Sequence, residues 1–151
     1  MLDSIDKKLI NLLQKNSKQT TKILSLQLNL SVTAVYERIK KLEQQKVIEK
    51  YVAIVNKNKI EKSFLVFCHI KLVQHSKENV TTFEHEILKL EEVSECFHVS
   101  GEYDYILKIY VKNMDAYRDF MVTKLTAIKY IGSTHSTFAI EQVKSTTAIY
   151  L

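Results

Sequence analysis

Two stretches of helically spaced apolar residues, separated by a short break, occupy positions 20–47 and restrict how the first third of the chain can fold. The apolar residues of the first stretch are Ile23, Leu24 and Leu28. Thr20 can accept a hydrogen bond from a free main-chain N–H group in the first turn of that helix. Asn29 tolerates the left-handed backbone that often ends a helix, and Ser31 can cap the next one. The pattern predicts a helix-turn-helix.

The second stretch predicts a helix with one buried stripe and an opposite side that is polar and positively charged. The buried positions would be Val32, Val35, Ile39 and Leu42. Small, hydrogen-bonding and cationic side chains on the other side are typical of a helix that lies in the major groove of DNA. The predicted DNA-binding residues are Ser31, Thr33, Ala34, Glu37, Arg38, Lys40, Lys41, Lys46 and Lys50. A solvated helix face explains the same spacing, because this motif also serves as plain scaffold.

Arg38 stands out because Arg118 is the only other arginine in this lysine-rich chain. Its planar guanidinium could bind a guanine edge or a phosphate through two hydrogen bonds. An ion pair with an acidic side chain of the first helix is an equal alternative. That helix is predicted from Asp3 to about Asn16, with Asp3 as its cap and Asp6 in its first turn. Capping explains both acids without a catalytic role.

The formal charge differs between the two parts of the chain. Residues 1–60 carry 12 lysines and arginines against 5 aspartates and glutamates, a charge of +7, whereas residues 61–151 carry 10 against 12, a charge of −2. Only the first part would attract phosphates at low salt. Residues 50–55 alternate in the manner of a strand, and the polar run 56–59 is typical of a linker. We therefore predict a helix-turn-helix domain with a linker strand over 1–60 and a second domain over 61–151.

The second domain shows six alternating segments. Strands are predicted at Phe64–Val73, Glu95–Val99, Tyr105–Val111 and Ser133–Val143, and helices at Glu78–Leu90 and Asp115–Ile128. The order βαββαβ predicts a ferredoxin-like fold, with helices on one face of an antiparallel sheet, so the whole chain is α+β. Apolar residues on both sides of the first strand imply that a second subunit covers the other face.

A loop at Gly101–Asp104 joins two apolar strands and contains one of only two glycines in the chain. Free main-chain N–H groups there could hold a carboxylate, Asp104 could meet an ammonium group, and Tyr103 could pack on a side chain. A plain hairpin turn explains the same residues.

Metal, cofactor and catalytic sites are not predicted. Cys96 and His98 share one face of a strand and Cys68 adjoins His69, but further ligands at zinc-like spacing are missing. The sequence holds no phosphate-binding glycine loop and no Gly-x-Ser-x-Gly motif. No apolar run approaches about 18 residues, so no membrane partner is expected, and the separated cysteines favour a reducing cytoplasm.

Taken in order, several short motifs resemble the Lrp/AsnC family of transcriptional regulators over nearly the whole chain. They are Leu2-Asp3-Ser4-Ile5-Asp6, Asn29-Leu30-Ser31, Glu37-Arg38-Ile39-Lys40-Lys41-Leu42-Glu43, Val47-Ile48, Val99-Ser100-Gly101-Glu102-Tyr103-Asp104-Tyr105 and Glu141-Gln142-Val143-Lys144. Each motif is short, and the combination is specific. Asn29 stands where relatives often have glycine, and His135 where some have arginine, which leaves operator choice and effector identity open.

The resemblance implies a winged-helix or helix-turn-helix half that binds double-stranded DNA and a ferredoxin-like half that forms homodimers, which usually assemble into octamers. It also implies that a small effector, commonly an amino acid, binds between dimers. The implied effector-binding residues are Gly101, Glu102, Tyr103 and Asp104, with Thr134 and Ser136 on the last strand.

Two other functions fit a similar build. Some relatives of this two-domain type look like sirohaem decarboxylases with a degenerate DNA-binding half, whereas here the basic face is retained. An architectural protein that compacts DNA with little sequence preference is the third possibility. The leading hypothesis is a sequence-specific regulator that is not an enzyme and carries no cofactor.

Overall fold

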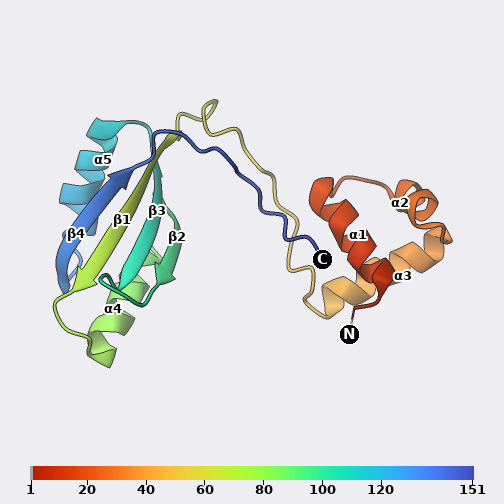
Figure 1. The fold of residues 1–151 in the computed structure, drawn as a ribbon, viewed down its shortest axis with the longest axis horizontal. Helices are drawn as coiled ribbons and strands as arrows, with labels where there is room; N and C mark the ends of the chain where they lie inside the picture. The colour runs from red at the N-terminus through yellow and green to blue at the C-terminus, as the bar shows by residue number, and fades with distance from the viewer. Residues whose placement is uncertain (1) are drawn as a thin grey trace. The chain divides into compact units, whose positions relative to one another are not determined.

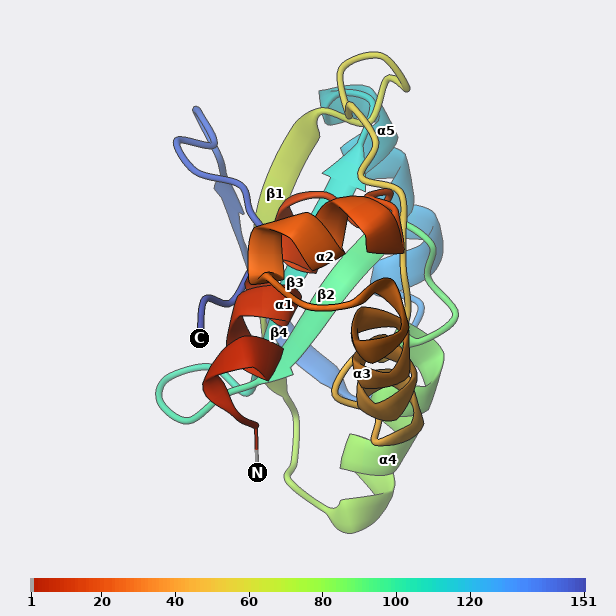
Figure 2. The ribbon, with the colours of Figure 1, turned by 90° about the vertical axis from the view of Figure 1, so that its right-hand side faces the viewer.

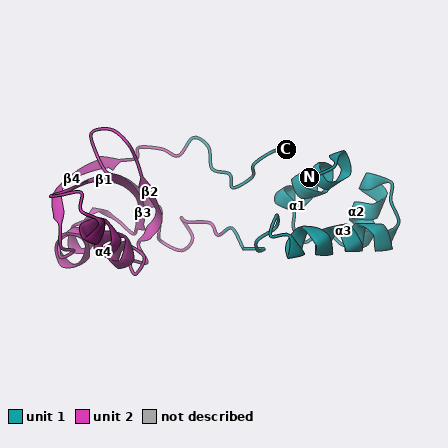
Figure 3. Ribbon diagram, turned by 90° about the horizontal axis from the view of Figure 1, so that it is seen from below, with its two compact units in different colours: residues 1–54, 143–151 teal, residues 55–142 magenta. Residues whose placement is uncertain are grey.

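The computed structural model describes residues 2–151, which form two compact units (Figure 3). Residues 2–54 and 143–151 form the first unit, and residues 55–142 form the second. The chain therefore crosses between the units twice. The predicted domains were 1–60 and 61–151, whereas the compact units place residues 55–60 with the second unit and residues 143–151 with the first.

Three helices make the first unit, and local signals begin and end each of them (Figure 2). They are α1 (Ser4–Lys15), α2 (Thr21–Leu28) and α3 (Val32–Gln44). Thr20 and Ser31 cap α2 and α3 as predicted, and Asn29 ends α2 in the left-handed region with φ of 54°. A small apolar core lies among the helices, formed by Leu9, Ile10, Leu13, Leu24, Val35 and Leu42. The helix-turn-helix prediction is confirmed.

Two predictions for the first unit are wrong. Val32 was expected in the core but is 46 % exposed, because it is the first residue of α3 and lies outside the core cluster. Residues 50–55 were expected to form a strand, but they contain no regular secondary structure. Strand formation requires a hydrogen-bonded neighbour, and none of the described residues pairs with this segment.

The second unit is a four-stranded antiparallel sheet with helices on one face (Figure 1). Its elements in chain order are β1 (Phe64–Leu72), α4 (Lys77–Ile87), β2 (Val93–His98), β3 (Tyr105–Val111), α5 (Met114–Phe120), a π-helical turn (Met121–Leu125) and β4 (Ile131–Phe138). The strand order is β2-β3-β1-β4. The predicted α+β, ferredoxin-like order is confirmed, although β4 ends five residues earlier than expected.

Alternation along the central strands separates the two faces of this sheet. In β3, Tyr105, Leu107, Ile109 and Val111 are buried with Phe83 of α4 and Phe120 of α5. The opposite face carries Phe67, Ile106 and Tyr110, each partly exposed, and Phe97, which is 49 % exposed. One face of the sheet is therefore packed, and the other, the open sheet face, presents aromatic and aliphatic groups.

Candidate functional site

The outward face of α3 carries a row of exposed side chains at helical spacing. Thr33, Glu37, Lys40 and Lys41 are exposed, and the buried Val35 and Leu42 lie on the other side of the helix. Positions three, four and seven residues apart share one side of a helix, so the predicted base-reading and phosphate-binding residues form one surface. Lys46 and Lys50 are also exposed, beyond the C-terminal end of α3. A cationic surface of this form can meet a nucleic-acid groove.

Ser31 caps the start of α3, and Ala34 lies in the first turn of that helix. The Ser31 hydroxyl oxygen accepts a hydrogen bond from the Ala34 main-chain N–H group at 3.1 Å. This bond satisfies a donor that the first turn of a helix leaves free. The hydroxyl can still donate its own proton, so Ser31 remains able to contact a phosphate.

Tyr36 lies on the outward face of α3 but was not predicted. Its ring is 48 % exposed, and the ammonium nitrogen of Lys40 lies 5.7 Å from the ring centroid. The signal was present in the sequence, because position 36 follows Thr33 by three residues. An aromatic ring there is neither a hydrogen-bonding base reader nor a cation, so the pattern of polar and cationic groups did not predict it.

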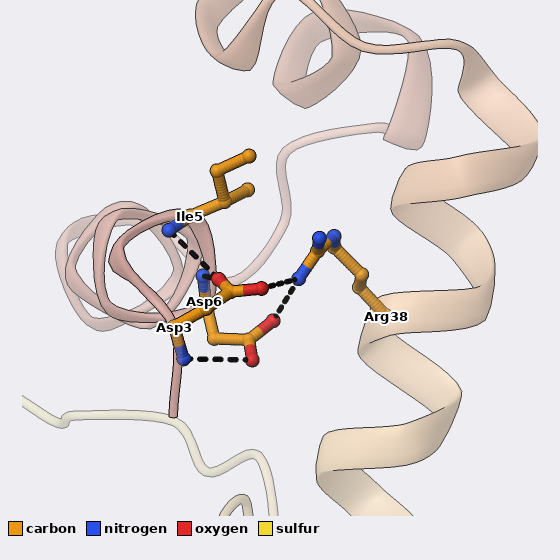
Figure 4. Close-up of polar contacts among 4 residues, drawn as sticks. All are labelled: Asp3, Ile5, Asp6 and Arg38. Atoms are coloured by element: carbon orange, nitrogen blue, oxygen red, sulfur yellow. Dashed lines mark hydrogen bonds and ion pairs between the residues drawn. The ribbon is translucent and has the colours of Figure 1, made fainter. Parts of the chain in front are cut away.

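Arg38 makes the intramolecular pair that the sequence left open (Figure 4). Its Nη1 lies 2.7 Å from Oδ2 of Asp3 and 2.5 Å from Oδ1 of Asp6, whose side chain is 2 % exposed. Hydrogen bonds to both carboxylates raise the pKa of Arg38, with that to Asp3 as the larger cause. The guanidinium therefore joins α3 to the start of α1. Among the described residues, Nε and Nη2 have no hydrogen-bond partner.

A capping box at the start of α1 places the two carboxylates. Oδ1 of Asp3 accepts hydrogen bonds from the N–H groups of Ile5 at 2.9 Å and Asp6 at 2.7 Å, and Oδ2 of Asp6 accepts from the N–H of Asp3 at 3.3 Å. The bond from the Asp6 N–H group and the bond from Arg38 lower the pKa of Asp3. One oxygen of each acid thus remains to meet Arg38.

The loop between β2 and β3 has an unusual backbone at Gly101. Its φ is 136°, a value that side chains disfavour, although a Cβ atom there would have nothing within 4 Å. Glycine is therefore required for conformation and not for space. Among residues 2–151, the main-chain N–H groups of residues 100–103 find no partner. These free donors fit the predicted carboxylate site.

Asp104 is nearly buried and is held by the fold itself. Its Oδ2 accepts a hydrogen bond from the Leu72 N–H group at 2.7 Å, and Oδ1 lies 3.2 Å from Nε2 of His75. Its own N–H group donates to the Ile70 carbonyl at 2.9 Å. The side chain expected to meet an ammonium group therefore also fixes the loop to the end of β1.

Tyr103 lies on one side of the sheet, and Thr134 and Ser136 of β4, predicted to share its site, lie on the other. The Tyr103 ring packs 5.1 Å from the ring of His69 and 6.1 Å from that of His135. Ser136 and Thr134 are paired instead with the buried Cys68 and Ile70, on the helix-covered face. The Ser136 hydroxyl lies 2.6 Å from the hydroxyl of Tyr117, whose pKa is raised to about 12 by burial. The structure brings Tyr103 to the two histidines and does not bring it to Ser136.

No group of three or more histidine, cysteine, aspartate or glutamate side chains among residues 2–151 could hold a metal ion. No helix in the same range is long and apolar enough to cross a bilayer.

Comparison with known proteins gives matches over both units. Residues 2–43 match the family model of the AsnC-type helix-turn-helix domain, and residues 65–149 match that of the Lrp/AsnC ligand binding domain. Leucine-responsive regulatory proteins of Klebsiella pneumoniae and Escherichia coli are 35 % identical over 150 residues, covering 99 % of this chain and 92 % of theirs.

Two solved structures share the fold over nearly their whole length. An AsnC family transcriptional regulator from Agrobacterium tumefaciens has a TM-score of 0.94 at 32 % identity, covering 98 % of this chain and 96 % of that one. A transcriptional regulator from Neisseria meningitidis, solved as a complex with L-Met, has a TM-score of 0.94 at 27 % identity, covering 99 % and 96 %.

Proposed function

Because this chain belongs to the Lrp/AsnC family of transcriptional regulators, we propose that it binds a specific DNA site through α3 and responds to an amino acid held at the Gly101–Asp104 loop. The outward face of α3 is the observation that carries the first half. The L-Met complex of the similar Neisseria protein supports the second half. The decarboxylase and architectural alternatives gain no support from these relatives.

DNA reading is assigned to the outward face of α3. Thr33 and Glu37 meet base edges, Tyr36 adds contact area, and Lys40 and Lys41 bind phosphates, joined by Lys46, Lys50 and Ser31 near the two ends of the helix. The Arg38 side chain is 27 % exposed and held by two carboxylates, so its main role is to fix α3 on α1. Its free nitrogens can add a contact to DNA.

Selection of bound sequences from a random DNA pool tests this reading, followed by mobility-shift titrations of the selected site across salt concentrations. We expect a defined motif and an affinity that falls steeply with salt, because phosphate contacts release counterions. Equal affinity for random and selected DNA would overturn specific reading. An affinity that ignored salt would overturn the role of the lysines.

Dimerisation is assigned to the open sheet face. Phe97 pairs with Ile106 across β2 and β3, and Phe67 and Tyr110 continue the apolar surface. Two copies that meet through this face would present two α3 helices to half-sites about one helical turn apart. Further assembly of dimers into an octamer follows the family pattern. We place the contacts between dimers at the Gly101–Asp104 loop, so that an effector bound there can alter assembly.

Sedimentation or mass measurement of Phe97→Glu tests the open sheet face. The added charge would have to lose its water inside an apolar contact, so we expect monomers. Val122→Glu is the control, because Val122 is 75 % exposed on the π-helical turn and lies outside that face. A Phe97→Glu protein with the assembly state of wild type would contradict the assignment.

Effector binding is assigned to the free N–H groups of residues 100–103 and to Asp104. The N–H groups receive the carboxylate, and the remaining acceptor capacity of Asp104 faces the ammonium group. We also propose that Thr134 contributes to the effector site. Ser136 would affect that site only indirectly, through its hydroxyl contact with Tyr117. Calorimetric titration with a panel of amino acids, beginning with L-Met and L-Leu, tests the site. If the Asp104→Asn protein bound the amino acid with the same heat and affinity as wild type, the role of this carboxylate would be contradicted.

A further inference from the structure

The final residues of the chain are fastened to α1 by two side-chain amides. Nε2 of Gln14 donates to the Ile149 carbonyl at 2.7 Å, and Oε1 of Gln14 accepts from the Ile149 N–H group at 2.7 Å. Nδ2 of Asn11 donates to the Leu151 carbonyl at 3.2 Å, and Oδ1 of Asn11 accepts from the Leu151 N–H group at 3.2 Å. Each amide thus engages both main-chain groups of one residue.

The spacing of these contacts matches a helix beside an extended segment. Asn11 and Gln14 are three residues apart, so they lie on the same side of α1. Ile149 and Leu151 are two residues apart, so their main-chain groups face the same way in an extended segment. A side-chain amide carries one acceptor and N–H donors, as a peptide group does, and so can replace a neighbouring strand.

The tail side chains are mostly exposed, Leu151 least of the three. Ile149 is 76 % exposed, Tyr150 is 65 % exposed and Leu151 is 52 % exposed. All four hydrogen bonds to the tail engage the main chain of residues 149 and 151. The N–H group of Tyr150, which lies between them, has no partner among residues 2–151.

We propose that Asn11 and Gln14 form a docking surface for residues 149–151 of the same chain, and that this docking gives the DNA-binding unit a second attachment to the sheet unit. The first attachment is the covalent passage near residues 55–63, and the second is the segment that follows β4. A unit held by one flexible segment can rotate freely, whereas two attachments restrict its orientation. The inference rests on the proposed binding of two DNA half-sites by a dimer.

Orientation matters because both α3 helices of a dimer must reach their half-sites together. The second half-site is bound at an effective concentration that falls when the tethered unit gains freedom. Release of the tail should therefore weaken binding to DNA with two half-sites by about fivefold, on the order of one lost net hydrogen bond. Binding to a single half-site should stay unchanged, because the outward face of α3 is untouched.

Two proline substitutions separate this mechanism from general damage to the tail. Ile149→Pro removes the N–H group that donates to Gln14, whereas Tyr150→Pro removes an N–H group that has no partner. We expect Ile149→Pro to weaken binding to two half-sites about fivefold and Tyr150→Pro to leave it within twofold of wild type. The double variant Asn11→Leu/Gln14→Leu should reproduce the effect of Ile149→Pro. Equal effects of the two prolines, or a lower assembly mass for Ile149→Pro, would overturn the proposal.

Amide hydrogen exchange measures docking without DNA. Residues 149 and 151 should exchange slowly in wild type and rapidly in Asn11→Leu/Gln14→Leu, and rapid exchange in wild type would overturn the docking. Protected amides in a wild-type protein that binds no DNA would overturn the proposed function instead, while supporting the docking surface.

Cysteine pairs decide whether the tail binds its own chain. In a Cys96→Ser background, a protein that carries both Gln14→Cys and Ile149→Cys should form a disulfide within one chain, because residues 14 and 149 are in contact. The remaining Cys68 is buried and should not compete. A mixture of one protein that carries only Gln14→Cys and one that carries only Ile149→Cys, both in the Cys96→Ser background, should remain uncross-linked. Efficient cross-linking in that mixture would show that a second copy supplies the tail and would overturn the proposal.

Discussion

Nη1 of Arg38 and Oδ1 of Asp6 lie 2.5 Å apart, and this ion pair links the middle of α3 to the first turn of α1. The Asp6 side chain is 2 % exposed, while that of Arg38 is 27 % exposed, so the pair lies at the edge of the core. Arg38, which the sequence predicted as a DNA-binding residue, therefore serves to orient α3, the helix that we propose reads DNA.

Asp6→Ala should destabilise the first unit by about 2 kcal/mol, because it leaves Arg38 with one partner and removes half of the capping box. Chemical denaturation followed by signals from α1 and α3 measures the change. Asp115→Ala, at an exposed position in the first turn of α5, is the control. A double-mutant cycle with Arg38→Ala should show coupling between the two sites. Additive effects would contradict the pair.

Acid should weaken the contact between α1 and α3 through Asp3. The bond from the Asp6 N–H group and the bond from Arg38 hold the folded-state pKa of Asp3 below its ordinary value of 3.8. Its stabilising contribution is therefore present above that ordinary pKa and is lost as pH falls through the lower folded value. Nuclear magnetic resonance signals of α3, followed from pH 5 downward, should show this loss. Asp3→Asn should flatten the acid branch, and an unchanged profile would contradict it.

Lys40→Ala and Lys41→Ala should each reduce the salt dependence of DNA binding by about one unit of slope, because each lysine is assigned one phosphate. Both should weaken binding similarly across DNA sequences. Mobility-shift titrations at several salt concentrations give the slope. Lys89→Ala is the control, since Lys89 is exposed and lies in the second unit. A slope equal to that of wild type would remove these lysines from the interface.

Gly101→Ala should reduce effector affinity about tenfold, because a φ of 136° costs a residue with a Cβ atom about 1–2 kcal/mol and the loop would leave this conformation. Calorimetric titration with L-Met or another bound amino acid measures the loss. Open space around the Cβ position means that the fold itself should persist, which circular dichroism can check. Unchanged affinity would show that the loop conformation is not needed for binding.

Local patterns predicted most of the secondary structure. The caps at Thr20 and Ser31 and the left-handed Asn29 were predicted correctly because each acts through neighbours within four residues. The alternation of β1 and β3 was equally clear, because their residues face a packed side and an open side in turn. The order of these elements then limited the second unit to a ferredoxin-like sheet.

Residues distant in sequence required the structure. Alternation at residues 50–55 predicted a strand, but a strand needs a partner that no local pattern supplies. Thr134 and Ser136 were grouped with Tyr103, although pairing with β1 places them on the other face of the sheet from the rings that Tyr103 contacts. Tyr36 escaped prediction for a different reason, since its helical spacing was plain in the sequence but its ring is neither cationic nor a base-reading amide or hydroxyl side chain.

The sequence by itself determined most of the helices and strands, how the helices of the first unit are capped, and that the net positive charge lies in the first part of the chain. Those properties depend on periodicity, short-range hydrogen bonds and composition. Only the tertiary structure decided that Arg38 binds Asp3 and Asp6 and that Gln14 binds the main chain of Ile149, contacts that span 35, 32 and 135 residues of sequence. Such contacts depend on where the fold brings distant groups together, which no local pattern records.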